Sequence, residues 1–244
     1  TPRTTALVMI NPNNPTGAVY SEDTVRGMAD IARRHGLVLL SDEIYEKVLF
    51  GDARHHHAAR AAGDDVLCLT FGGLSKAYRV CGYRAGWVVA TGPISHATDL
   101  LEGLTLLSNM RVCPGVPAQH AIPVALAEDS PWGHDVVDPD GRLERQLART
   151  TERLNAIPGV SCVAPRGALY CFPRLDREMF GISSDEQFAL DLLRSEHVLV
   201  THGTGFNWPE PDHFRIVCLP EAPVLDRALD AIARHLDRLR LAAA

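Results

Sequence analysis

Four short and almost wholly apolar runs constrain the fold of this 244-residue chain more than any other feature of its sequence. They cover residues 5–10, 37–40, 66–71 and 87–90, and a stretch containing Asn, Ser or Gly ends each of the first three. Runs of this length and character are typical of strands that are buried on both faces of a sheet. The pattern predicts an α/β fold with a mainly parallel sheet that is covered on both faces.

An amphipathic helix is predicted between the first two runs. Ser21 is a suitable N-cap, Glu22 and Asp23 place negative charge at the positive end of the helix dipole, and Gly36 is a typical stop. Apolar residues recur on one face at helical spacing: Val25, Met28, Ala29 and Ala32. A helix that alternates with apolar strands supports the same fold class.

The pattern changes after Pro93, and this predicts a second domain. Residues 94–128 read as largely helical, and residues 129–140 are rich in Asp, Pro and Gly. Beyond them the pattern predicts helices ending near residue 155, at 185–196 and at the C-terminal end, with short strands at 160–163, 169–172, 198–201 and 214–218. We therefore predict a larger domain at 1–128 and a smaller α+β domain at 129–244.

Bulk composition narrows the class of protein. The formal net charge is −6 and basic residues form no run, which argues against a nucleic-acid partner. The apolar runs are too short to span a bilayer, and the first residues show no apolar leader segment, so a cytoplasmic protein without a membrane partner is expected. The six cysteines are scattered, which favours buried, reduced thiols over a disulfide framework or a zinc site.

Polar residues follow the first three apolar runs. Asn14 comes after the first, Asp42 after the second, and Ser75 with Lys76 after the third. In open α/β sheets, ligands bind outside the carboxyl ends of the strands, so these residues are expected to converge at one edge of one sheet. Each is weak evidence by itself, because a lone Asp after a strand is usually a helix cap and a lone Lys in a loop is usually a surface residue.

The order of four motifs along the chain is more specific than any one of them. They are Asn-Asn-Pro-Thr-Gly at 13–17, Ser-Asp-Glu-Ile-Tyr at 41–45, Gly-Leu-Ser-Lys at 73–76 and Gly-Tyr-Arg-Ala-Gly-Trp at 82–87. This combination resembles the class I and II aminotransferases, which have the type I fold of pyridoxal-phosphate (PLP) enzymes. Further blocks at 117–121, 166–170, 205–209 and 212–216 resemble the bacterial alanine, or glutamate–pyruvate, aminotransferases. The resemblance covers nearly the whole chain.

The resemblance implies the cofactor PLP and gives a role to each residue that matches a family motif around it. Lys76 would hold the cofactor as a Schiff base and then move the proton at the substrate Cα, while Asp42 would pair with the pyridine nitrogen. Asn14 and Tyr45 would hydrogen-bond the phenolic oxygen, and the Asn14–Pro15 bond would be cis. As catalytic residues the resemblance gives Lys76, Asp42 and Tyr45.

The resemblance also implies the groups that bind phosphate and substrate. Ser75 and Arg84 match ligands of the cofactor phosphate, and Arg215, together with Asn14, matches the group that binds the substrate α-carboxylate. The chain departs from the family at Gly73, where a hydroxyl residue is common, so one side-chain contact to the phosphate would be absent or made by a backbone amide.

The implied activity is transfer of the amino group from L-alanine to 2-oxoglutarate and back, with pyruvate and L-glutamate as the products of the forward reaction. An aminotransferase for aromatic amino acids or aspartate, a C–S lyase, a PLP-binding regulatory domain and an inactive fragment are alternatives. The full-length protein is expected to be a homodimer. The resemblance further implies that a long N-terminal portion of the family's chain is absent from these residues, and so we expect the isolated chain to bind PLP poorly.

Two smaller features admit more than one interpretation. The tract His55-His56-His57 reads as a solvated loop and not a metal site, because adjacent histidines do not easily face one ion and the sequence shows no carboxylate cluster beside them. Tyr170, Phe206 and Trp208 either line the substrate pocket or pack in the core of the second domain.

Overall fold

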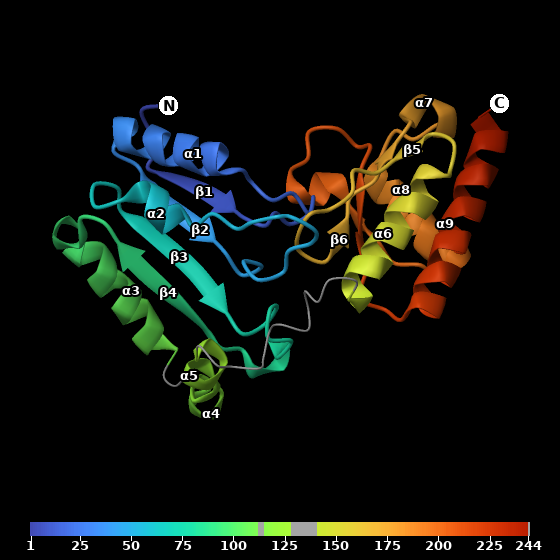
Figure 1. Cartoon of the computed structure of the whole chain (residues 1–244). Helices are drawn as coiled ribbons and strands as arrows, with labels where there is room; N and C mark the ends of the chain where they lie inside the picture. The colour runs from blue at the N-terminus through green and yellow to red at the C-terminus, as the bar shows by residue number, and fades with distance from the viewer. Residues whose placement is uncertain (112–114, 128–140, 244) are drawn as a thin grey trace. The chain divides into compact units, whose positions relative to one another are not determined.

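The computed structural model describes residues 1–111, 115–127 and 141–243. They form two compact units, each with its own internal contacts (Figure 1). The first unit contains Thr1–Pro12 and the described residues from Val19 to position 127, and the second contains Asn13–Ala18 and the described residues from position 141 onward. The domain boundary predicted at 128/129 lies outside the described residues.

The first unit is built on a four-stranded sheet with the order β1-β2-β3-β4. The strands are β1 (Ala6–Ile10), β2 (Val38–Asp42), β3 (Cys68–Gly73) and β4 (Gly86–Thr91). The first three are parallel and β4 runs antiparallel to β3. All four predicted strands exist within two residues of their predicted bounds, and the α/β fold with a mainly parallel sheet is confirmed.

One face of this sheet packs against two helices, α1 (Glu22–His35) and α2 (Ala58–Ala62) (Figure 1). The Ser21 side chain caps α1 by accepting from Thr24 N, and Gly36 ends it in the left-handed conformation, as the sequence predicts. Apolar side chains from the helices and strands form the core between them: Met9, Val25, Ala29, Ala32, Leu39, Ala58, Ala62, Val66 and Cys68. The short helix α2 was not predicted, because five residues carry too little periodicity to recognise.

The opposite face of the sheet is partly open, and here the prediction of coverage on both faces is wrong for the described residues. Val8 is 65% exposed, Phe71 40% and Val88 47%. The helices α1 and α2 both lie on the other side, and α3 (Thr98–Met110) buries none of its own side chains.

The stretch at 94–128 that was predicted as largely helical contains α3 and also η2 (Ile94–His96), α4 (Val116–Gln119) and α5 (Ala121–Leu126), so that prediction holds where the chain is described.

The second unit is α+β, with antiparallel strands in the orders β6-β9-β8 and β5-β7. Its core lies between the strands and three longer helices, and the final helix contributes Leu225, Leu229, Ile232 and Leu236. The elements are α6 (Arg142–Asn155), β5 (Val160–Ser161), β6 (Tyr170–Cys171), β7 (Arg174–Leu175), α7 (Arg177–Phe180), α8 (Asp185–Glu196), β8 (Thr201–His202), η3 (Gly203–Phe206), β9 (Phe214–Val217) and α9 (Ala222–Ala243).

Four of the six cysteines are buried free thiols, as predicted: Cys68, Cys162, Cys171 and Cys218. Cys81 is free but exposed, and Cys113 lies outside the described residues. Among the described helices, none combines the length and the apolar character needed to cross a bilayer.

The turn after β4 depends on a glycine at position 92. Gly92 has φ +90°, and a Cβ there would lie 2.2 Å from the carbonyl oxygen of Val66. We expect Gly92→Ala to lower the free energy of unfolding of the first unit by at least about 2 kcal/mol, because strain and a backbone clash act together. Chemical denaturation compared with Gly36→Ala provides the test. Gly36 has φ +61° but open space around it, so its replacement carries only the conformational cost of about 1 kcal/mol. Equal losses in the two variants would show that the clash is relieved at no cost.

Candidate active site

The carboxyl ends of the central strands form a pocket of about 570 Å³ in the first unit. Asp42 enters it from the end of β2, Ser75 and Lys76 from the loop after β3, and Arg84 from the turn after η1 (Cys81–Tyr83). We call it the strand-end pocket. Asp42, Ser75 and Lys76 were expected from the sequence to converge, and they do so because parallel strands end at the same edge of the sheet. Arg84, which the resemblance gives as a phosphate ligand, lines the same pocket.

Asp42 is held in place by the strands on both sides of it. It pairs in register with Ile10 and Phe71, and its carbonyl oxygen accepts a 3.0 Å hydrogen bond from Asn11 N. Its side-chain Oδ1 accepts a 3.1 Å bond from Ile44 N. The carboxylate therefore has a fixed direction at the floor of the pocket.

Lys76 presents its amine beside Tyr45. The Nζ atom lies 5.6 Å from the centroid of the Tyr45 ring, and Tyr45 is only 3% exposed. The loop that carries Lys76 is fastened at its start by the bond from Leu74 N to Ala85 O, 3.1 Å long. A half-buried amine on a fastened loop is suitable for covalent chemistry with a bound aldehyde.

Arg84 and Ser75 place a guanidinium and a hydroxyl on the same side of the strand-end pocket. Arg84 Nη1 lies 3.5 Å from Ser75 Oγ and donates a 2.9 Å bond to Cys81 O. The arrangement suits an anion with several oxygens, such as a phosphate.

The sequence departure at Gly73 has a steric reason. A Cβ there would lie 3.0 Å from Ile44 Cδ1 and 3.2 Å from Ala85 O, so a hydroxyl residue would be crowded.

Arg215 forms a separate cationic site within the second unit. Its guanidinium lies between two aromatic rings, 4.5 Å from the Tyr170 centroid and 4.7 Å from that of Phe206. Nη1 donates a 2.8 Å bond to Asn14 Oδ1, and the buried Nε has no hydrogen-bond partner among the described residues. The rings exclude water and the unpaired donor favours an anion, so the site is suitable for a carboxylate.

Asn14 belongs to the second unit because the short segment Asn13–Ala18 is fastened there. The carbonyl oxygen of Gly17 accepts bonds from Arg166 N and Gly167 N at 2.9 and 3.0 Å. Gly17 has φ +71°, and a Cβ would lie 2.4 Å from that of Pro165. The Asn14–Pro15 bond is cis, as expected, and so is Asn11–Pro12, which was not expected. Convergence of Asn14 with the strand-end pocket stays a prediction.

The aromatic residues of the second unit make two different kinds of contact, and whether any of them lines a substrate pocket stays a prediction. Tyr170 and Phe206 face the Arg215 guanidinium. Trp208 packs instead against Phe172 and His213, with ring centroids 5.2 and 4.5 Å away. It is therefore part of an aromatic cluster.

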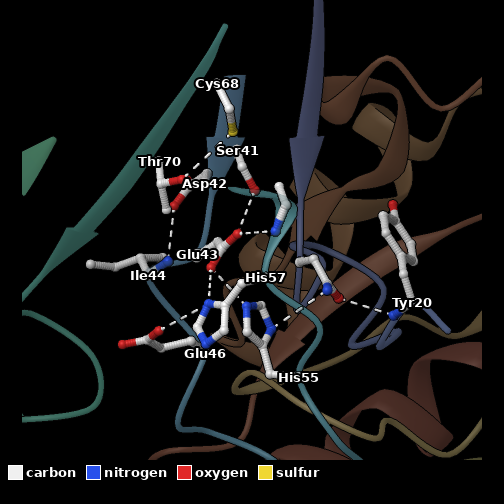
Figure 2. A network of polar contacts seen from close by, with 12 residues as sticks. Tyr20, Ser41, Asp42, Glu43, Ile44, Glu46, His55, His57, Cys68 and Thr70 are labelled. Atoms are coloured by element: carbon white, nitrogen blue, oxygen red, sulfur yellow. Dashed lines mark hydrogen bonds and ion pairs between the residues drawn. The ribbon is translucent and has the colours of Figure 1, made fainter. Parts of the chain in front are cut away.

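A second polar cluster lies around Glu43, the residue that follows Asp42 (Figure 2). Glu43 is 2% exposed and accepts bonds from His55 Nε2 at 2.9 Å and His57 Nδ1 at 2.6 Å. Burial acts to raise the pKa of Glu43, but the hydrogen bonds from both histidines and from Ala58 N hold that pKa well below its ordinary value. The bond to Glu43 raises the pKa of His57 above its ordinary value, although burial opposes this shift.

This cluster shows that the interpretation of residues 55–57 as a solvated loop is wrong for His55, whereas the His57 side chain is 47% exposed. The His55 side chain is 5% exposed, and the carboxylates that the sequence did not place near it are Glu43 and Glu46. The signal that could have indicated the cluster is the i, i+2 spacing of His55 and His57, because alternate side chains of an extended segment point the same way.

Comparison with known proteins decides the family. The family model for aminotransferase class I and II matches residues 1–232. The chain belongs to the class I and II aminotransferases. It is 58% identical to the alanine aminotransferase of Mycobacterium tuberculosis over 240 residues, which are 97% of this chain and 54% of that protein. It is 52% identical to the glutamate–pyruvate aminotransferase AlaA of Escherichia coli, covering 97% of this chain and 58% of that protein.

The solved structures support the same assignment. A crystal structure of an aminotransferase from Escherichia coli superposes with a TM-score of 0.93 at 51% identity, over 97% of this chain and 58% of that one. The chain thus spans a little over half the length of the aminotransferases it matches.

Proposed function

We propose that this chain serves a PLP-dependent aminotransferase that exchanges the amino group between L-alanine and 2-oxoglutarate. The observation that carries the proposal is the strand-end pocket, in which Asp42, Ser75, Lys76 and Arg84 meet. The choice of substrates rests on the relatives, which are named alanine aminotransferase and glutamate–pyruvate aminotransferase. The homodimeric state and the cytoplasmic location stay predictions from the family resemblance.

The donor set of the pocket fits PLP group by group. Lys76 offers an amine for the aldehyde, Asp42 a carboxylate for the pyridine nitrogen, and Arg84 with Ser75 a cation and a hydroxyl for the phosphate. Tyr45 would bind the phenolic oxygen, and the family resemblance implies the same role for Asn14. When bound, the cofactor supplies an electron sink for the charge that develops when the substrate Cα loses its proton.

The residues of the chain then have distinct tasks. Lys76 Nζ takes the proton from the substrate Cα and returns it during the transfer. Asp42, whose carboxylate is fixed by the bond from Ile44 N, would hold the ring nitrogen of the cofactor and favour its protonated form. Arg215 and Asn14 bind the α-carboxylate and so fix the orientation of the reacting C–H bond.

The proposal is tested by the absorbance spectrum of the purified full-length protein with added PLP, followed by addition of L-alanine, because the isolated chain is expected to bind PLP poorly. An L-alanine-dependent spectral change with formation of pyruvate, and recovery of the first spectrum on addition of 2-oxoglutarate, is expected. A panel with L-aspartate, L-tyrosine and L-cysteine separates the other specificities. Turnover of one of these in preference to L-alanine would contradict the substrate assignment.

Replacement of Arg215 tests the carboxylate site. Arg215→Lys is expected to lower kcat/KM for both substrates by about 10²–10³-fold, because a lysine ammonium cannot bind a carboxylate in bidentate fashion or stack between two rings. Steady-state kinetics with each substrate provides the measurement. Arg174→Lys is the matched control, since Arg174 lies in the same unit with a side chain 66% exposed. A similar decrease in both variants would contradict the assignment.

A further inference from the structure

The cluster that follows Asp42 has no task in the proposed aminotransferase reaction. Its members are Glu43, Glu46, His55 and His57, and their ligand-type atoms all lie within 4.8 Å of one another (Figure 2). Two imidazoles with two carboxylates are a nitrogen and oxygen donor set that zinc commonly takes in proteins.

The two oxygens of Glu43 have different surroundings. Oε1 accepts bonds from Ser41 Oγ and Ala58 N, both 2.9 Å long, and so is fastened to the protein. Among the described residues, Oε2 accepts hydrogen bonds from the two histidine rings. A carboxylate with one oxygen fixed by hydrogen bonds and the other directed at imidazoles is the arrangement that supports a metal ligand.

The present separations are close to those of a tetrahedral site. Zinc binds nitrogen and oxygen at about 2.0–2.1 Å, which places the ligand atoms roughly 3.3 Å from one another. Glu43 Oε2 lies 2.9 Å from His55 Nε2 and 2.6 Å from His57 Nδ1, and His57 Nδ1 lies 3.8 Å from Glu46 Oε2. Shifts of less than about 1 Å would make room for the ion. The side chains of His57 and Glu46 are 47% and 28% exposed, so an ion can enter from solvent.

One contact opposes metal binding, and the loss of zinc affinity that it causes can be bounded. Asn11 Oδ1 accepts from Tyr20 N, so its Nδ2 is the atom that faces His55 Nδ1, at 3.5 Å. This places the His55 proton on Nε2. Binding of zinc at Nε2 would move that proton to Nδ1, opposite the Asn11 amide, and the His57 Nδ1 proton would leave to solvent. Loss of so long a hydrogen bond is expected to weaken the affinity by about tenfold to a hundredfold, which a four-ligand zinc site tolerates.

We propose that Glu43, Glu46, His55 and His57 form a site for a divalent transition metal, with Zn²⁺ as the preferred ion. The metal would replace the protons that the two rings now direct toward Glu43, and the Oε1 bonds to Ser41 and Ala58 would stay in place. The proposal does not depend on aminotransferase activity.

The test is a Zn²⁺ titration of protein without a polyhistidine tag, in competition with a chromophoric chelator. One equivalent is expected to bind with a Kd of about 1 µM or lower. His57→Ala and Glu46→Ala are each expected to weaken binding at least tenfold. His56→Ala is the matched control, because His56 lies between the two histidines and outside the cluster, and it is expected to change the Kd by less than about twofold. Glu43 and His55 are left intact, since their side chains are buried.

Titration with Co²⁺ identifies the ligand type. The site predicts the weak visible bands of nitrogen and oxygen ligation, unchanged in Cys81→Ser, which removes the exposed thiol. A strong thiolate charge-transfer band, a Kd above about 100 µM, or equal affinities in the His56 and His57 variants would each overturn the proposal.

Discussion

Replacing Lys76 with alanine is expected to abolish covalent attachment of PLP and to lower the rate of transamination by at least about 10⁴-fold. In the proposed reaction Lys76 supplies both the nucleophile for the cofactor and the base for the substrate Cα, and loss of a single general base already costs about 10²–10⁴-fold. The strand-end pocket contains no second lysine among its lining residues, so no nearby amine can substitute.

The chain offers an unusually clear control, because it contains only two lysines, Lys47 and Lys76. Lys47 Nζ donates a 2.8 Å bond to Tyr78 OH and does not line the strand-end pocket. Borohydride reduction of the PLP-loaded protein, followed by digestion and mass spectrometry, is expected to find the cofactor on the peptide with Lys76. Label on the Lys47 peptide, or activity retained in Lys76→Ala but lost in Lys47→Ala, would reject the assignment of Lys76.

Replacing Glu43 with alanine is expected to destabilise the first unit by roughly 3 kcal/mol. The variant leaves several donors around a buried site without an acceptor: Ser41 Oγ, Ala58 N, and one ring nitrogen each of His55 and His57. Each buried donor without a partner costs about 1–3 kcal/mol, and solvent access to His57 together with loss of a proton from its ring reduces the total.

Native-state hydrogen exchange of the β2 amides measures the local free energy of opening without interference from the second unit. Glu46→Ala is the matched control, because it removes a neighbouring carboxylate that is 28% exposed and lies 3.8 Å from His57. Its effect is expected to stay within about 0.5 kcal/mol. If the two variants lose the same stability, Glu43 does not organise the cluster.

The family and the strand-end pocket could be predicted from the sequence because their information is local. Apolar runs of four to six residues locate the four strands, and Ser21 with Gly36 marks the limits of α1. The polar residues that follow such strands must lie at one edge of a parallel sheet, so Asp42 and Lys76 meet for a reason that the chain order already contains. Elements with very few residues, such as α2 and β7, were not predicted because they are too short to show a period.

The rest depends on contacts between residues far apart in the chain. Asn14 pairs with Arg215, which is 201 positions away, because Gly17 allows the segment around it to pack against residues 165–167 of the second unit. Glu43 meets His55 and His57 only once β2 and the segment before α2 are folded together.

The amino-acid sequence by itself therefore determined the positions of the four strands, the placement of Asp42 and Lys76 at one edge of the sheet, and the family. The tertiary structure alone decided that His55 is buried against the Glu43 carboxylate and that the Arg215 guanidinium lies between two aromatic rings. The physical reason is that periodicity and motif spacing report the neighbours of a residue along the chain. Side-chain hydrogen bonding and burial are set by neighbours in space, and these exist only after the strands and helices have packed.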